Sequence, residues 1–331
     1  MKKSVQLELS EPVYCTYHYQ GSGGCVLGNN LSIKNWYLNH VMILNCSRSF
    51  LFGYSSPLAC IFDSSFENNP HLEVLKIPLK YLGNRTNSAI KKMIDDGYYV
   101  AFEGIDDYYV EGKSWYGQRH FCHDGLIFGY DENDRTFSIY AYDNNWQYSM
   151  FRASQSGFEM GRKSGMDMEG FCCIYAIKTK PWHVDLDCCE IKKQLEIYLD
   201  SSLEKYPPDI NYIVQGTVVH DYIIMYLDKL IDGSIPYEKT DQRVFRLIWE
   251  HKKVMYDRIL AVEDMLKSGK KFSDEYAPLV REAEMMRMLY ASHNFRRRDS
   301  ILPMIRKKLE FIKKKEIEIL TDFVSYLKGV L

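Results

Sequence analysis

The sequence of 331 residues has no long apolar run, no C-x-x-C motif and no excess of charge of one sign. No window approaches the roughly 18 apolar residues that a membrane-spanning helix requires. The N-terminus has two lysines, but no apolar segment follows them as it would in a signal peptide. A net charge of −2 gives the whole chain no bias toward nucleic acid. We therefore expect a cytoplasmic protein with neither a membrane nor a nucleic acid as its partner.

The nine cysteines are scattered, and none forms a C-x-x-C motif. Their odd number and the lack of a secretion signal predict reduced thiols, and their spacing predicts no structural zinc site. Two pairs are adjacent in sequence. We expect Cys172 and Cys173 to pack within a strand, whereas the sequence indicates no role for Cys188 and Cys189.

The two halves of the chain differ in their hydrophobic patterns. Up to residue 180, short β-rich runs alternate with one amphipathic segment, which predicts strands at 72–77, 98–103, 124–130, 136–142 and 171–178 and a helix at 86–96. Beyond Pro181, apolar residues recur at helical spacing in 187–204, 214–232, 241–268, 276–294 and 300–328. We predict an α+β protein with a mixed domain at 1–180 and a helical domain at 181–331.

A glycine-rich approach to a cysteine, QGSGGC at 20–25, suggests a nucleophile. Glycine permits a tight turn before Cys25, and a helix that started there would favour the thiolate through its dipole. Gln20 would then offer an amide to an oxyanion. Cys15 is the rival nucleophile, although it lacks the glycine approach. The plainer interpretation is that Cys25 is a small buried side chain.

A base for this thiol could come from HFCHDGLIFGYD, which begins at His120. The pattern predicts a hairpin in which His123 opens one strand and Asp143 ends the next, so that the two side chains lie together. Asp143 would then fix the tautomer of the imidazole. A metal site using His120 and His123 is the competing functional interpretation, and a hairpin with surface histidines is the structural one. No third ligand stands nearby, so we predict no metal.

The order Cys25, His123, Asp143 and the segments HDGLIFGYD and IYAYDN resemble the papain-like cysteine-peptidase fold. Within that fold, the layout of a catalytic domain followed by helices looks like the N-terminal group of butirosin biosynthesis protein H. It is also similar to the amide synthase of closthioamide biosynthesis. The resemblance implies a papain-like catalytic domain over 1–180.

The same resemblance implies an enzyme of natural-product biosynthesis that forms an amide bond. Cys25 would take an acyl group from a thioester on a phosphopantetheinyl carrier protein and pass it to a small amine, with no cofactor in the protein itself. Two alternatives remain open. One is a cysteine peptidase that cleaves a leader or small peptide, and the other is a non-catalytic binding protein on a degenerate papain-like scaffold.

Two segments suggest substrate and partner contacts. The aromatic, acidic loop at 106–116 has the composition of a lid, whose acids, including Glu111, could hold an ammonium group; its candidates are Asp106, Asp107, Tyr108, Tyr109 and Trp115. An acidic carrier protein would dock on a basic surface. The candidates for that surface are Arg296, Arg297, Arg298, Lys307 and Lys308. Both segments also fit simple solvated surfaces.

Overall fold

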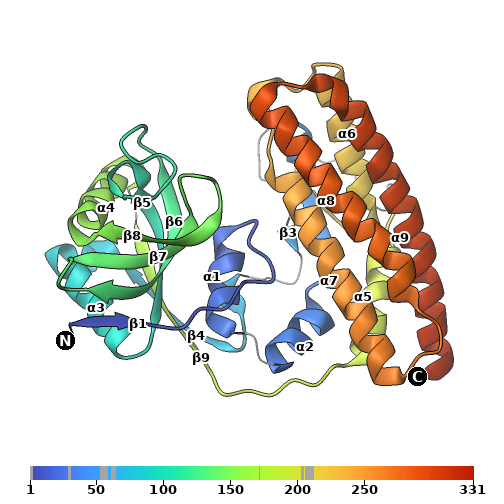
Figure 1. The fold of residues 1–331 in the computed structure, drawn as a ribbon, viewed down its shortest axis with the longest axis horizontal. Coiled ribbons are helices and arrows are strands. Elements are labelled where there is room, and N and C mark those ends of the chain that lie inside the picture. The colour runs from blue at the N-terminus through green and yellow to red at the C-terminus, as the bar shows by residue number, and fades with distance from the viewer. Residues whose placement is uncertain are drawn as a thin grey trace. The chain divides into compact units, whose positions relative to one another are not determined.

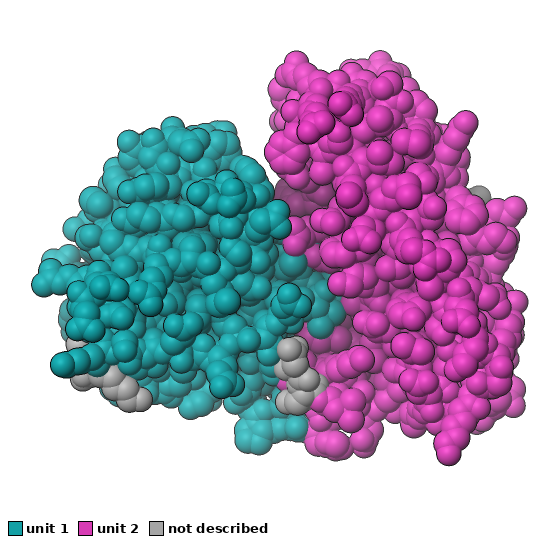
Figure 2. All heavy atoms as spheres, viewed as in Figure 1, with its two compact units in different colours: residues 1–29, 64–182 teal, residues 30–63, 183–331 magenta. Residues whose placement is uncertain are grey.

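The computed structural model describes residues 3–28, 31–52, 59–60, 65–170, 172–202, 205 and 212–331. The chain forms two compact units (Figures 1 and 2). The first contains residues 1–29 and 64–182, and the second contains residues 30–63 and 183–331. No helix in the described ranges combines the length and the hydropathy needed to cross a membrane.

An antiparallel sheet is the framework of the first unit. Its strands are β1 (Ser4–Gln6), β4 (Leu72–Pro78), β5 (Tyr99–Asp106), β6 (Cys122–Asp131), β7 (Thr136–Tyr142), β8 (Tyr148–Ser154) and β9 (Cys173–Thr179). They lie in the order β4–β9–β5–β6–β7–β8, and β1 pairs with the end of β6. A register shift in β5 between Phe102 and Ile105 brings Ile105 opposite His123. This irregularity sets which side chains meet at the start of β6.

Three helices flank the sheet: α1 (His18–Leu27), α3 (Thr86–Asp95) and α4 (Gln155–Glu169). Figure 1 shows α3 and α4 on one side of the sheet and α1 on the other. Ile90 and Ile94 of α3 and Phe158 of α4 share one buried core with alternate residues of the central strands, among them Phe102 and Ile127. Because side chains alternate across a strand, the residues between them are free to meet α1.

The second unit combines a helical bundle with a small sheet. Its helices are α2 (Leu31–His40), α5 (Cys188–Leu199), α6 (Val219–Ile231), α7 (Arg243–Leu266), α8 (Phe272–Arg296) and α9 (Leu302–Val330). Strands β2 (Leu44–Ser47), β3 (Ala59–Cys60) and β10 (Ile213–Gln215) form an antiparallel sheet in the order β10–β2–β3. The residues that the sequence marked as helical stripes, such as Ile305, Leu309 and Phe323 of α9, are fully buried. Their burial follows from the apolar periodicity.

A buried ionic cluster lies among the helices of this unit. Lys252 of α7 bonds both carboxylate oxygens of Glu316 of α9, at 2.6 and 2.7 Å, and Tyr198 and Tyr276 donate to the same carboxylate. Burial alone would raise the pKa of Glu316, but Lys252 and nearby histidines outweigh it and lower the pKa to about 2. His220, completely buried beside this pair, has its pKa lowered to about 4 by burial and by Lys252. The cluster therefore holds a charged pair and a neutral imidazole inside the bundle.

Residues 30–63 belong with the helices because α7 binds the end of α2. The guanidinium of Arg258 donates to the carbonyl oxygens of Leu38 at 2.5 Å and Val41 at 2.9 Å. The ring of His251 bonds the carbonyl of Met42 at 2.6 Å. These carbonyls at and just beyond the C-terminus of α2 lack helical partners, and the buried side chains of Arg258 and His251 satisfy them.

Several sequence predictions are confirmed, namely the mixed α and β character, the antiparallel hairpin β6–β7 and the five C-terminal helices. A division into 1–180 and 181–331 is wrong in one respect, because residues 30–63 fold with the helical unit. That segment contains α2 and β2, and its attachment depends on contacts with α7 and on the pairing of β2 with β10, which no local pattern reveals.

Candidate active site

The structure contradicts the predicted setting of Cys25. Helix α1 begins at His18, so Cys25 is its eighth residue and lies near its C-terminal end. The thiol is buried, and this burial, together with the nearby Cys15, raises its pKa well above the usual range. A helix C-terminus also disfavours an anion. The three glycines do not form a turn before a helix but lie within α1, where Gly21 and Gly23 pass close to Tyr148 and Phe66.

Gln20, the predicted oxyanion donor, also lies inside α1 and not in a turn before it. It is the third residue of α1 and is buried. Residues five apart on an α-helix are rotated by roughly 140°, so Gln20 and Cys25 project from different sides of the same helix.

Cys15, the rival nucleophile of the sequence analysis, lies on the N-terminal side of α1. It lies two residues before the N-cap residue Tyr17 of α1, and it is half-buried. The first turn of α1 carries no acidic residue, so the positive end of the helix dipole is not neutralised there. The hydroxyl of Tyr142, at the end of β7, donates to the carbonyl of Cys15 at 2.8 Å. The chain before α1 is thereby attached to the sheet at the end of β7.

His123, at the start of β6, is braced by an aspartate that the sequence analysis did not assign to it. Its Nδ1 lies 2.9 Å from Oδ2 of Asp107, and Asp107 is 1% exposed. The other carboxylate oxygen lies 3.4 Å from Nζ of Lys113, itself buried and bonded to the carbonyl of Asp124 at 2.8 Å. Asp107 thus fixes the orientation of the imidazole ring through Nδ1, so that Nε2 is the ring nitrogen on the side away from the carboxylate.

The predicted pair of His123 with Asp143 is not formed. Asp143 Oδ1 accepts the backbone N–H groups of Asn145 and Gln147, and Oδ2 accepts the hydroxyl of Ser149. These bonds lower the pKa of Asp143 even though burial opposes them. Asp143 is therefore a turn residue that joins β7 to β8. The prediction failed because an aspartate that ends a strand can equally well organise the following turn.

His18 lies between the segment that carries Cys15 and the ring of His123. It is the first residue of α1 and is buried, and its ring centroid lies 5.1 Å from that of His123 and 5.2 Å from that of Tyr142. Tyr142 is the residue that bonds the carbonyl of Cys15. The ring contacts therefore place the segment that carries Cys15 beside His123, across the interface of α1 with the sheet.

A second histidine–aspartate pair lies beside the first. His120 Nδ1 is 2.6 Å from Oδ2 of Asp106, which also accepts the hydroxyl of Ser164 at 2.6 Å. Oδ1 of Asp106 accepts the backbone N–H groups of Tyr108 and Phe121, both at 3.1 Å. Burial would raise the pKa of Asp106, but these hydrogen bonds outweigh it and lower the pKa. Because Tyr108 and Phe121 stand at the two ends of one loop, Asp106 holds that loop closed.

The acids of this loop do not form the ammonium site that the sequence suggested. Asp106 and Asp107 are buried and bonded to histidines, and Glu111 accepts the amide and the hydroxyl of Ser154. The loop is also attached to the β7–β8 turn, because the hydroxyl of Ser114 donates to the carbonyl of Asp143. Attached in this way, the loop is a wall of the site rather than a free lid.

The aromatic candidates of the loop lie at its surface. Tyr108 stacks on His120 at 4.3 Å and meets Tyr109 edge to face at 5.0 Å. Trp115 meets Trp146 edge to face at 5.7 Å. Sequence reasoning missed Asp107 as the partner of His123 and missed His18 entirely. Two adjacent aspartates at the end of the strand before a H-x-x-H segment were the available signal for the first.

The basic candidates in the helical unit are partly neutralised. Arg297 pairs with Glu238 at 3.2 Å, and Lys308 pairs with Glu282 at 2.6 Å. Arg296, Arg298 and Lys307 are exposed. Of the five basic residues that the sequence suggested as a docking surface, these three remain as candidates.

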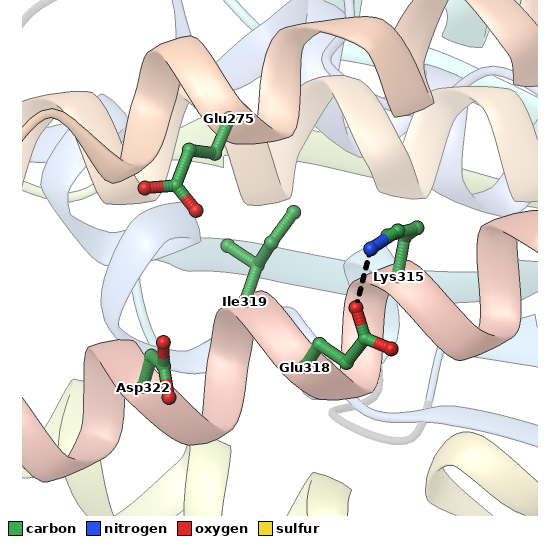
Figure 3. A pocket seen from close by; sticks show the side chains of 5 residues that line it. All are labelled: Glu275, Lys315, Glu318, Ile319 and Asp322. Carbon is green, nitrogen blue, oxygen red and sulfur yellow. Dashed lines mark hydrogen bonds and ion pairs between the residues drawn. The ribbon is translucent and has the colours of Figure 1, made fainter.

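A hollow of about 350 Å³ lies between α8 and α9 (Figure 3). Its lining residues are Glu275, Lys315, Glu318, Ile319 and Asp322, and Lys315 pairs with Glu318 at 2.6 Å. Carboxylates dominate this lining, and it holds neither a thiol nor an imidazole. The hollow therefore does not serve the chemistry of Cys15 and His123.

The two adjacent cysteine pairs are placed as follows. Cys172 is buried just before β9, with its sulfur 2.8 Å from the carbonyl of Gly104, and Cys173 begins β9, so only the second cysteine of the pair lies in the strand. Cys188 is buried at the start of α5, and Cys189 is exposed. The described residues contain no group of three or more His, Cys, Asp or Glu side chains that could hold a metal ion. His120 and His123 instead bind different aspartates.

Comparisons with known proteins gave no match to any family model and no similar curated protein.

Proposed function

We propose that the first unit is a cysteine-dependent acyltransferase in which Cys15 is the nucleophile, His123 the general base and Asp107 the residue that orients the base. The observation that carries this proposal is the buried Asp107 on Nδ1 of His123, with His18 and Tyr142 linking the same imidazole to the segment of Cys15. A thiol, a base and an orienting carboxylate are the components of nucleophilic acyl transfer.

The chemistry runs in two steps. His123 takes the proton of Cys15, and the thiolate attacks the carbonyl carbon of an acyl thioester. The tetrahedral intermediate collapses, the carbon–sulfur bond of the donor breaks, and the donor thiol leaves with the proton from His123. An amine then attacks the acyl-Cys15 carbonyl, His123 accepts its proton, and the amide departs as the Cys15 thiolate reforms. The positive N-terminal end of α1 favours both the thiolate and the oxyanion.

The proposed reaction is amide formation from a carrier-protein thioester. This substrate assignment rests on the resemblance to papain-like amide synthases, and the segment HDGLIFGYD is part of that resemblance. Aromatic rings support it, because His18 and Phe121 contact the ring of His123 and Tyr142 contacts that of His18, and rings in these positions would limit the access of water to the acyl-enzyme. On the helical unit, Arg296, Arg298 and Lys307 would meet an acidic carrier protein.

The experiment is intact-protein and peptide mass spectrometry after mixing the full chain with an acylated carrier protein. The expected result is one added acyl mass on Cys15, which is lost when a primary amine is supplied. Cys15→Ala should abolish the adduct. Cys25→Ala is the matched control, since it removes a thiol from the same region and should leave the adduct intact.

Three outcomes would contradict the proposal. An adduct on Cys25 would reverse the assignment of the nucleophile. Cleavage of peptides together with inert thioesters would favour a cysteine peptidase with the same residues. Iodoacetamide labelling of Cys15 no faster than that of the exposed Cys189 would indicate a binding protein without an activated thiol.

A further inference from the structure

An arginine beside the candidate active site is held between aromatic rings. The guanidinium carbon of Arg119 lies 5.5 Å from the ring centroid of Trp115 and 5.8 Å from that of Phe121. Such stacking uses the flat faces of the guanidinium and leaves its N–H edge available. The backbone N–H of Arg119 also donates to the carbonyl of Trp115 at 3.2 Å, which fixes the position of the residue.

Arg119 is a charged side chain at the surface of the first unit. Within the described ranges, no carboxylate forms an ion pair with Arg119, and the residue is exposed. The nearest acids of the loop are already occupied, since Asp106 and Asp107 hold histidines and Glu111 holds Ser154. A guanidinium that is positioned but not paired can accept a carboxylate in bidentate geometry.

This arginine lies one ring away from the proposed base. Phe121 contacts Arg119 on one side and meets the ring of His123 edge to face at 4.9 Å. The amide of Phe121 is bonded to the buried Asp106, so the short segment from Arg119 to His123 is held in place. An anion on Arg119 would therefore belong to a group close to the reacting carbonyl.

A second tryptophan extends the apolar surface. Trp146 meets Trp115 edge to face and is 39% exposed. Its φ is 58°, a left-handed conformation that is uncommon for a large side chain. The turn organised by Asp143 imposes this conformation, because the amide of Trp146 donates to the carbonyl of Asp143 at 3.0 Å. An exposed indole kept in a strained conformation is a feature that clusters at binding sites.

We propose that Arg119, Phe121, Trp115 and Trp146 form a subsite that binds a carboxylate attached to an aromatic or apolar group. The inference rests on the proposed function for the chemistry at Cys15, and it replaces the ammonium site that the sequence suggested with a site of opposite charge. The carboxylate has two possible sources, which are the acyl group of the donor and an amino acid that serves as the amine acceptor.

Binding is tested first without any acyl transfer. The full chain, labelled with fluorotryptophan, is titrated with 3-phenylpropionate and with the neutral 3-phenylpropionamide while fluorine NMR follows the five tryptophans. Trp115→Phe and Trp146→Phe assign two of the signals. Saturable shifts of these two signals with the carboxylate, and at least tenfold weaker binding of the amide, are expected.

Charge variants test the role of Arg119. Arg119→Gln should weaken the binding of the carboxylate about tenfold, and Arg119→Lys should weaken it less because it keeps the charge but loses the bidentate geometry. Arg152→Gln is the control, since it removes an arginine of the same unit that pairs with the exposed Asp134. Equal binding of acid and amide, or unchanged binding by Arg119→Gln, would overturn the inference.

Turnover then distinguishes the two sources. Thioesters with and without a terminal carboxylate are compared as donors, and phenylalanine is compared with phenethylamine as acceptor. If Arg119→Gln removes the preference for a carboxylate in the donor comparison, the carboxylate belongs to the acyl group. If it does so in the acceptor comparison, the carboxylate belongs to the amine. If no acyl-Cys15 forms with any substrate, the proposed function fails, whereas the binding titration still decides the subsite.

Discussion

The most informative single change is Asp107→Asn, because it removes the charge behind His123 and keeps the shape of the side chain. An amide at this position can present either an oxygen or an NH₂ group to Nδ1, and the second choice stabilises the wrong tautomer of the imidazole. In the Ser-His-Asp template, the same replacement lowers the rate by about 10⁴-fold. We expect acylation of Cys15 to fall by roughly 10²- to 10⁴-fold.

The same change also affects stability, because Asp107 is buried beside Lys113 with 3.4 Å between their charged atoms. Leaving a buried ammonium without its partner costs about 3 kcal/mol or somewhat more. For a unit of this size, each kcal/mol shifts Tm by roughly 2–4 °C. Tm should therefore fall by roughly 6–12 °C.

A double variant separates the two effects. Asp107→Asn combined with Lys113→Met removes both charges, so most of the lost stability should return while the rate of acylation stays low. The assay is the rate of adduct formation on Cys15 from a model thioester, followed by mass spectrometry, with Tm measured on the same samples. Asp143→Asn is the matched control, since asparagine supports the same turn and should change the rate by less than about threefold.

A rate for Asp107→Asn within about threefold of the unmodified protein would refute the reasoning, because a base that needs an orienting carboxylate cannot tolerate that change. Loss of activity in Asp143→Asn with normal activity in Asp107→Asn would restore the pair that the sequence predicted. Recovery of activity in the double variant would show that stability alone was limiting.

Three further predictions concern stability. Lowering the pH from 7 to 4.5 should destabilise the helical unit, because the pKa of His220 in the folded protein is lowered to about 4. The stability that the neutral imidazole contributes is fully present above the unfolded pKa of about 6.5, and it is lost as the pH falls toward 4. Urea unfolding followed by circular dichroism measures this loss, and His220→Gln should reduce the slope. Lys252→Met should cost about 3–5 kcal/mol, since it leaves Glu316 charged and buried, and adding Glu316→Gln should return part of this energy in the same unfolding assay. Gly165→Ala should lower Tm markedly, because its methyl group would lie 1.9 Å from the carbonyl oxygen of Gly104, whereas Gly269→Ala meets open space and should not.

The outcomes that would contradict these predictions are equally specific. A pH dependence that is unchanged in His220→Gln would assign the acid sensitivity to other groups. An unchanged free energy of unfolding for Lys252→Met would mean that Glu316 takes up a proton or becomes hydrated without destabilising the fold. Equal Tm values for Gly165→Ala and Gly269→Ala would mean that α4 shifts away from β5 without loss.

Much of the framework could be predicted from local patterns. The strand at 136–142 and the helix near 86–96 follow from alternation and from helical spacing, and α9 follows from its apolar stripe. His123 was identified as a residue that opens a strand, and it does lie at the start of β6. Each of these features depends on neighbours within a few residues, which is the range over which sequence patterns are informative.

The partners of the candidate site could not be predicted in this way. The shift in register between Phe102 and Ile105 decides that Asp107, and not Asp143, reaches His123. The start of α1 at His18 decides that Cys15, and not Cys25, lies before the helix, although the glycines favoured the opposite. Likewise, contacts between distant segments attach residues 30–63 to the helical unit, among them those of Arg258 and His251 and the pairing of β2 with β10.

The sequence by itself therefore determined which segments form strands and helices and that a thiol and an imidazole are available, because periodicity and residue chemistry are local properties. The tertiary structure decided which sulfur and which carboxylate belong to that imidazole. One extra residue in a strand, or a helix that begins a few residues earlier, redirects every following side chain, and packing energy between distant segments selects that register.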